Sequence, residues 1–256
     1  MTQVKSISYA QPIKLTLNYL CTFYFFDIYC NRFIFLENAM AKKTVQAESY
    51  LRLFHIASHT PSIDLYIDEQ KNATDILYED FTPYHALTAG THSIIITLKD
   101  DTETLYERKI NLSPYKIYTL LLLNEPKHPD QCLIYLIEDV RRSIKANECM
   151  CRLGHFHLQV EPLELHLKVD EQEILKKVGT YEMTPYFPLA ANTYLLELIE
   201  KYTQALALQK KDLLLKPERF YTLYIIENTE KEFAPQLILS IDGNSYIHPV
   251  RPKIDN

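Results

Sequence analysis

The chain has 256 residues, a formal net charge of −6, 47% hydrophobic residues and 19 tyrosines. This length suits two domains of about 100 residues, and the apolar content excludes global disorder. With only 4 glycines, a glycine-rich phosphate loop is not expected. Lys and Arg do not cluster, so nucleic-acid binding is not expected either. The 5 cysteines are irregularly spaced, which favours free thiols in a reducing compartment such as the cytoplasm.

Residues 1–47 differ in composition from the rest of the chain. The stretch 15–36 is apolar and long enough to suggest a membrane span. However, it contains Asp27 and Arg32, which are costly in a bilayer, and no convincing signal-peptide pattern follows it. A membrane role is therefore not favoured. The segment could be an extra strand or helix, a weak anchor, or an over-extended start. We favour translation from Met40, because the repeat described next begins only after it.

The remainder of the chain is an internal tandem duplication. Matching segments are "SYLRLFH" (49–55) with "MCRLGHFH" (150–157), "FTPYHAL" (81–87) with "MTPYFPL" (183–189), and "PYKIYTLLLL" (114–123) with "PERFYTLYII" (217–226). The shift between copies drifts only from 100 to 103 residues, which indicates two copies with short loop insertions. We assign residues 48–140 to the first repeat and 149–256 to the second. Corresponding motif residues are Arg52 and Arg152, His55 and His155, Tyr84 and Tyr186, Gly90 and Asn192, and Tyr118 and Tyr221.

Each repeat is predicted to consist of short strands. The segments 62–68 and 162–168 alternate apolar and polar residues, as half-buried strands do. The continuous apolar runs "HSIIITL" (92–98) and "YTLLLL" (118–123) have strand length and suit strands buried against a second sheet. Residues 92–112 and 194–215 are predicted to be equivalent hairpins, although the second could be a helix from its composition. About seven strands per repeat predict two tandem immunoglobulin-like antiparallel β-sandwiches, joined end to end.

Turn residues support this assignment. Gly90 corresponds to Asn192, and these residue types tolerate positive φ best, so a tight turn is predicted at both. Asp242-Gly243 lies between two strand-like runs and predicts a hairpin. In the doubled Thr-Pro-Tyr phrase, the proline lacks an N–H and is predicted to lie on an edge strand. Tyr84 and Tyr186 would then turn inward as anchors of each sandwich.

Several of these segments resemble a known bacterial family. They are "YLRLFHIASHTPSIDLYID", "FTPYHALTAGTHSIII", "INLSPYKIYTLLLL" and "LILSIDGNSYIHP". The chain resembles, over about 48–250 and in two copies, the tandem module called domain of unknown function 4397. The resemblance implies an immunoglobulin-like sandwich, often at a bacterial surface or in spore-forming bacteria, with no established activity. The Ser-Pro-Asp loop of the family is replaced here by "ASHTP" (57–61) and "LQVEP" (158–162), so its acidic residue is absent.

The residues best suited to chemistry favour structural roles. Cys149, Cys151, His155 and His157 are possible zinc ligands, but Cys151 and His155 would lie roughly 13 Å apart along a strand, too far for one ion. His155 and His157 remain weak metal candidates that would need a third ligand. Otherwise His55 and His155 are expected to be buried and hydrogen-bonded to backbone.

The two arginines are expected to face outward. Arg52 would then pair with Asp64 across the strands, and Arg152 with Glu164, contributing little to stability. The alternative for these arginines is an anion or peptide site in a cleft between the repeats.

The sequence therefore predicts a non-enzymatic structural or protein-interaction module. No catalytic, cofactor-binding or firm metal-binding residue is expected. The partner would be a protein or a second copy, contacted through exposed edge strands. The location would be the cytoplasm, with a spore or cell surface as the alternative. The alternative function is a small-ligand or carbohydrate-binding module that uses a cleft between the repeats.

Overall fold

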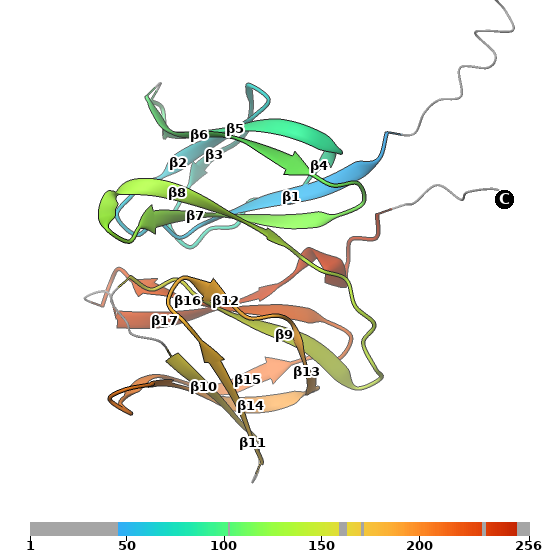
Figure 1. Ribbon diagram of the computed structural model, residues 1–256, viewed down its shortest axis with the longest axis vertical. Coiled ribbons are helices and arrows are strands. Elements are labelled where there is room, and N and C mark those ends of the chain that lie inside the picture. Colours follow the sequence, from blue (N-terminus) through green and yellow to red (C-terminus); the bar gives the residue numbers. More distant parts are fainter. Residues whose placement is uncertain (1–45, 102, 159–162, 170–171, 232–233, 250–256) are drawn as a thin grey trace, which may run out of the picture. The chain divides into compact units, whose positions relative to one another are not determined.

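The computed structural model describes residues 46–101, 103–158, 163–169, 172–231 and 234–249 (Figure 1). Its regular elements are strands, with one short 3-10 helix, η1 (Gly243–Ser245). The predicted all-β class is therefore confirmed. Residues 1–45, which include Met40 and almost all of the non-repeat segment, lie outside the described residues. In the described part, no helix is long and apolar enough to cross a membrane.

Eight strands form two four-stranded sheets in the first repeat (Figure 1). They are β1 (Glu48–His55), β2 (Ile63–Ile67), β3 (Gln70–Ile76), β4 (His85–Thr88), β5 (Gly90–Leu98), β6 (Thr104–Leu112), β7 (Ile117–Glu125) and β8 (His128–Glu138). Sheet I has the order β4-β1-β7-β8, and sheet II has the order β3-β2-β5-β6. β1 and β7 pair in parallel, and the other pairs are antiparallel. A core of aliphatic side chains, among them Leu53, Leu65 and Ile96, lies between the two sheets.

The second repeat has the same plan. Its strands are β9 (Glu148–His155), β10 (Leu163–Val169), β11 (Gln172–Val178), β12 (Glu182–Met183), β13 (Phe187–Ala190), β14 (Asn192–Glu200), β15 (Leu206–Leu215), β16 (Phe220–Asn228) and β17 (Ala234–Ile241). Sheet III has the order β12-β9-β16-β17, with β13 also paired to β9, and sheet IV has the order β11-β10-β14-β15. The two hairpins predicted at 92–112 and 194–215 are confirmed as β5–β6 and β14–β15. The repeat therefore overrides the helical composition of the second hairpin.

Two of the turn predictions need correction. Gly90 has a φ of 139°, as expected, but Asn192 is not among the described residues with positive φ. Its Oδ1 accepts a hydrogen bond from the Thr193 N–H (2.8 Å), so its side chain supports the start of β14 instead. Asp242 and Gly243 form no hairpin, because β17 ends before them and η1 follows. Asp242 is fully buried, and its carboxylate forms the ion pair with Arg52 that is described below.

The faces of β7 and β16 explain their continuous apolar runs. One face of each strand contributes to the core of its own sandwich, for example Leu120 in the first repeat and Leu223 in the second. The other face contributes to a separate apolar cluster, which contains side chains from both repeats: Phe54, Ile56, Leu121, Leu123, Ile137, Phe156, Tyr224 and Ile226. The expectation of an end-to-end arrangement is therefore wrong. Sheets I and III contact each other through faces that a single sandwich would expose.

Candidate functional site: a buried charge network between the repeats

The two repeat arginines lie in the contact between sheets I and III. Arg52 is on β1 between Leu51 and Leu53, whose side chains point into the sandwich, so the period-two geometry of a strand sends Arg52 to the opposite face. Arg152 has the same place on β9. The two side chains are only 6% and 3% exposed, respectively. The prediction that they are exposed and paired with Asp64 and Glu164 is therefore wrong, because the other repeat covers this face.

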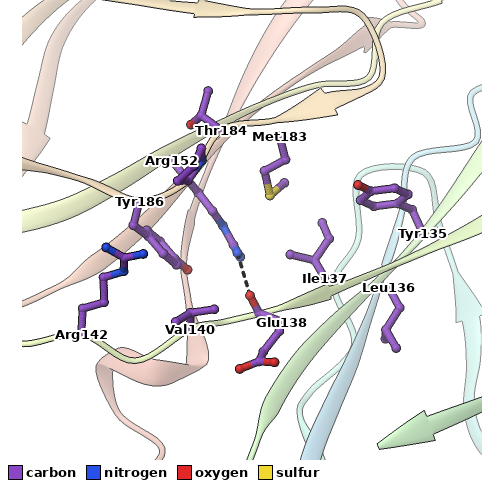
Figure 2. Close-up of a pocket in the computed structure, with 11 residues that line it drawn as sticks. Tyr135, Leu136, Ile137, Glu138, Val140, Arg142, Arg152, Met183, Thr184 and Tyr186 are labelled. Atoms are coloured by element: carbon purple, nitrogen blue, oxygen red, sulfur yellow. Dashed lines mark hydrogen bonds between the residues drawn. The ribbon is translucent and has the colours of Figure 1, made fainter.

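Arg152 donates hydrogen bonds to three different groups, and its Nη2 also lies 3.5 Å from Asp242 Oδ2 of its own repeat. Its Nε–H donates to Thr222 Oγ1 (2.7 Å), its Nη1 to the Glu138 carbonyl oxygen (3.1 Å) and its Nη2 to Asp139 Oδ1 (2.5 Å). Figure 2 shows the bond to the Glu138 carbonyl. Thr222 is on the neighbouring strand β16, whereas Glu138 and Asp139 belong to the end of the first repeat. The guanidinium therefore joins its own sheet to the other sandwich.

Arg52 makes the corresponding set of contacts in the opposite direction. Its Nε–H donates to Thr119 Oγ1 (3.0 Å), and its Nη2 donates to Asp242 Oδ1 (3.1 Å) and Ser240 Oγ (2.8 Å). Its Nη1 lies 3.5 Å from the Ile241 carbonyl oxygen, the counterpart of Glu138. The acidic residue that ends each repeat thus pairs with the arginine of the other repeat. We call the following residues the charge network: Arg52, Arg152, Asp139, Asp242, Thr119, Thr222 and the tyrosines Tyr84 and Tyr186, whose hydroxyls contact the two acids.

The doubled Thr-Pro-Tyr phrase supplies the tyrosines of this network. In the first repeat, Phe81 forms an isolated β-bridge with Phe54, and His85 pairs with Leu51. The three residues 82–84 therefore lie opposite only the two residues 52–53. In the second repeat Met183 pairs with Gly154 and Phe187 with Cys151, so residues 184–186 lie opposite only residues 152–153. Each phrase is therefore an extra-residue irregularity of the bulge type, in an edge strand. The predicted edge position of the prolines is confirmed by the sheet order.

The bulge places each tyrosine ring against the arginine of its own repeat. The Arg52 guanidinium lies 4.8 Å from the Tyr84 ring centre, and that of Arg152 lies 4.5 Å from the Tyr186 ring centre. The Tyr84 hydroxyl donates to Asp139 Oδ2 (2.9 Å), and the Tyr186 hydroxyl donates to Asp242 Oδ2 (2.6 Å). The tyrosines therefore belong to the charge network and not, as predicted, to the core of their own sandwiches.

The threonine of the phrase anchors the bulge to the strand beside it. Thr82 Oγ1 accepts a hydrogen bond from the Leu53 N–H, and Thr184 Oγ1 accepts one from the Leu153 N–H, both at 2.9 Å. A backbone group that the bulge would otherwise leave unpaired is thus satisfied in both copies.

Burial shapes the acid–base properties of the network. Burial and the neighbouring Asp242 raise the pKa of Asp139. Burial alone would lower the pKa of Arg152, but Asp242 and Asp139 more than reverse this, so the guanidinium stays charged. Burial also raises the pKa of Tyr84, Tyr186 and Tyr224, the last to about 12.

A pocket opens beside the network next to each Thr-Pro-Tyr phrase. The pocket shown in Figure 2 has a volume of about 360 Å³ and is bordered by Arg152, Pro185 and Tyr186 of the second repeat and by residues 135–138 of the first. A wider pocket of about 660 Å³ is bordered by Arg52, Pro83 and Tyr84, with Tyr246 from the second repeat. Both pockets therefore reach the network from solvent.

The histidines of the two repeats have different surroundings. His55 Nε2 lies 3.2 Å from the Pro61 carbonyl oxygen, and its Nδ1 accepts from the Ala57 N–H, as expected for a structural histidine. His155 is fully buried, but its ring nitrogens have no hydrogen-bond partner among the described residues, and burial lowers its pKa to about 4. His157 Nδ1 lies 4.0 Å from the buried Glu227. In the described segments, no group of three or more His, Cys, Asp or Glu could hold a metal ion.

The remaining repeat-motif residues occupy equivalent structural positions. The Tyr118 hydroxyl accepts from the Ser113 N–H (3.2 Å), and the Tyr221 hydroxyl accepts from the Lys216 N–H (3.0 Å). Each tyrosine thus closes the turn that precedes its strand. Sequence reasoning missed Asp139 and Asp242, although they lie 103 residues apart, the same shift as the Tyr-Thr pairs of β7 and β16. That shared shift could have identified both acids from the sequence.

The fold and the network define a protein of two β-sandwich repeats joined by a buried ionic contact. The model of the family described as "Domain of unknown function (DUF4397)" matches residues 49–166, which confirms the resemblance seen in the sequence. The matched region covers the first repeat and the first strands of the second.

Other comparisons add no functional information. No curated protein matches the chain. A leucine-rich repeat protein from Bacteroides thetaiotaomicron is similar to it at 11% identity, with a TM-score of 0.19, over 64% of this chain and 24% of that one. The tip fimbrial protein Mfa3 from Porphyromonas gingivalis is similar at 9% identity, with a TM-score of 0.24, over 76% of this chain and 99% of that one. Similarities this weak carry no argument about function.

Proposed function

We propose that the protein is a non-enzymatic structural or protein-interaction module, in which two sandwiches act as one unit. The observation that supports this most is the use of the charge network. Each arginine is bound by an acid, a threonine and a backbone carbonyl, and each acid is bound by an arginine and a tyrosine. The charged and polar groups of the network, which could have bound a substrate, instead bind one another and join the repeats.

The surface available to a partner is then the set of sheet edges. Each sheet ends in edge strands, among them β8 and β17, whose backbone groups can pair with a further strand. The free thiols of Cys132, Cys149 and Cys151 support residence in a reducing compartment, so we extend the proposal to a cytoplasmic protein or a component assembled onto a spore.

Thermal unfolding and oligomeric state together test the proposal. The unfolding temperature should be unchanged by divalent metals, by mono- and oligosaccharides and by common metabolites, because a ligand that binds only the folded state raises it. In the same buffers the protein should associate with itself or with a protein partner. A large, saturable stabilisation by one small molecule would contradict an interaction module.

The pocket in Figure 2 favours one alternative, a small-ligand or carbohydrate-binding module. Its volume of about 360 Å³ lies within the range of ligand sites, roughly 300–1,000 Å³. It is bordered by both repeats, and Val140 and Arg142 line it and are exposed. If a ligand from the thermal screen binds there, Val140→Trp should fill the pocket and abolish the shift. The matched control Leu77→Trp, at another exposed apolar position, should preserve it.

A further inference from the structure

Strand β17 is an edge of sheet III with an unusual surface. In the described part of the chain it pairs only with β16, over eight consecutive residue pairs without any shift of register. Its sequence, APQLILSI, contains no charged residue. Pro235 removes one backbone donor near its beginning, which leaves the stretch from Gln236 to Ile241 able to pair fully.

The other long edge strands are protected. Edge strands usually carry charges, bulges or prolines that prevent pairing with another chain. Strands β3, β6, β8 and β15 each carry charged residues and have a register irregularity with their neighbour, and β11 carries Glu173, Lys176 and Lys177. Strands β4, β12 and β13 have at most four residues. Strand β17 is the described long edge that has neither a charged residue nor a register irregularity, and its proline lies near its beginning.

The core-facing side chains of β17 are also incompletely covered. Leu237, Leu239 and Ile241 pair in register with Ile225, Leu223 and Tyr221 of β16, which belong to the core of the second sandwich. Nevertheless Leu239 is 38% exposed and Ile241 is 46% exposed. Apolar side chains that continue a core to an open sheet edge would be buried by one more strand.

We propose that two copies of the chain associate by pairing β17 with β17 of the partner subunit, antiparallel about a two-fold axis. This rests on the proposed interaction role and names its partner. The pairing would extend sheet III into a continuous sheet across both copies. Side-chain alternation limits the register, because residues directly opposite each other lie on the same face. Of the registers that satisfy it, we choose the one that pairs residues 235–241 with the same residues of the partner subunit. Ile238 then lies on the axis, and Leu237 lies opposite Leu239 of the partner subunit.

The charge distribution makes this edge the one at which a second copy can pair. Each chain carries a net charge of −6, which opposes self-association in general. Pairing through the charged edges would also set ionised residues against those of the partner copy. An uncharged strand that meets itself brings no like charges into opposition, and its apolar residues are self-complementary in an isologous contact.

Sedimentation equilibrium of the full chain, from low micromolar to submillimolar concentration, tests this pairing. The wild type should show a concentration-dependent monomer–dimer equilibrium. Leu239→Lys should weaken the dimer at least about tenfold, because a charge replaces an apolar cross-strand contact. The matched control Leu214→Lys, on edge β15 and 54% exposed, should dimerise as the wild type does. Circular dichroism melts of all three proteins should show that the variants remain folded.

Cysteine cross-linking tests the register. Ile238→Cys should form an interchain disulfide under mild oxidation, since it faces itself across the axis, whereas Leu239→Cys should not. A wild type that stays monomeric at every concentration overturns the proposal, as does a dimer weakened by Leu214→Lys and not by Leu239→Lys. If Leu239→Cys forms the interchain disulfide and Ile238→Cys does not, the proposed register is wrong. The outcomes of this experiment can be distinguished from those of the thermal-unfolding test of the proposed function. A protein that stays monomeric and is stabilised by no small ligand contradicts only the β17 pairing. A small ligand that stabilises the protein contradicts only the interaction role.

Discussion

Replacing Arg152 with methionine should destabilise the protein strongly. The substitution keeps much of the aliphatic volume and removes the charge. It leaves the carboxylate of Asp139, which is 0% exposed, without its cation. Removing one partner of a buried ion pair costs about 3–5 kcal/mol, because the remaining charge stays buried and uncompensated. The lost donors to Thr222 and to the Glu138 carbonyl add to this direction.

A double-mutant cycle separates the pair from general loss of packing. Urea unfolding should be measured for Arg152→Met, Asp139→Asn and the double variant. The double variant should be less destabilised than the sum of the single variants, by about 0.5–3 kcal/mol, because no unpaired charge is left. Lys177→Met is the surface control. Its pair with Glu164 has a lysine that is 62% exposed, so about 0–1 kcal/mol is expected. Equal, small losses for Arg152→Met and Lys177→Met would refute the buried network.

Two further predictions concern other sites. Gly243→Ala should cost about 1–3 kcal/mol, because its Cβ would lie 2.8 Å from Ile117 Cγ2, whereas Gly179→Ala should cost little because its Cβ meets only the mobile end of a glutamate. Equal unfolding midpoints for both variants would contradict this. Burial alone would raise the pKa of Asp64, but hydrogen bonds from Lys71 and two other donors lower it to about 2. The stability that Asp64 contributes is therefore present above about pH 4 and lost as the pH falls towards 2. Asp64→Asn should flatten the pH dependence of the urea midpoint in that range. If the midpoint of the variant depends on pH as steeply as that of the wild type, the pair of Asp64 with Lys71 does not stabilise the fold.

Much of the fold follows from local pattern and repetition. The alternation in β2 and the continuous apolar run in β7 identify strands, and the repeat correctly assigns 194–215 to a hairpin against its helical composition. The turn at Asn192 could not be inferred from Gly90, because an asparagine side chain can support the backbone without positive φ. Residue types that tolerate a conformation do not require it.

The site was less predictable for a different reason. Period-two alternation correctly places Arg52 on the face opposite Leu51 and Leu53, but it does not say what covers that face. The apolar run of β7 contained the missing information, because a strand that is apolar on both faces must be buried on both. Applied to sheet I, that reasoning would have predicted a buried arginine, and a buried arginine requires a carboxylate. The matching shift of Asp139 and Asp242 would then have named both partners.

The doubled Thr-Pro-Tyr phrase is explained by the reciprocity of the network. Each phrase forms an edge irregularity that sets a tyrosine against its own arginine and aims the hydroxyl at the acid of its own repeat. That acid is in turn paired with the arginine of the other repeat. Among the described residues, Arg52 has an ion pair only with Asp242 of the other repeat, whereas Arg152 contacts Asp139 of the other repeat and also lies 3.5 Å from Asp242 of its own. The burial of Arg52 in particular therefore depends on the duplication. Buried ion pairs add little net stability over apolar contacts, but they penalise any arrangement that leaves a charge unpaired. The network thus favours the arrangement in which each arginine meets the acid of the other copy.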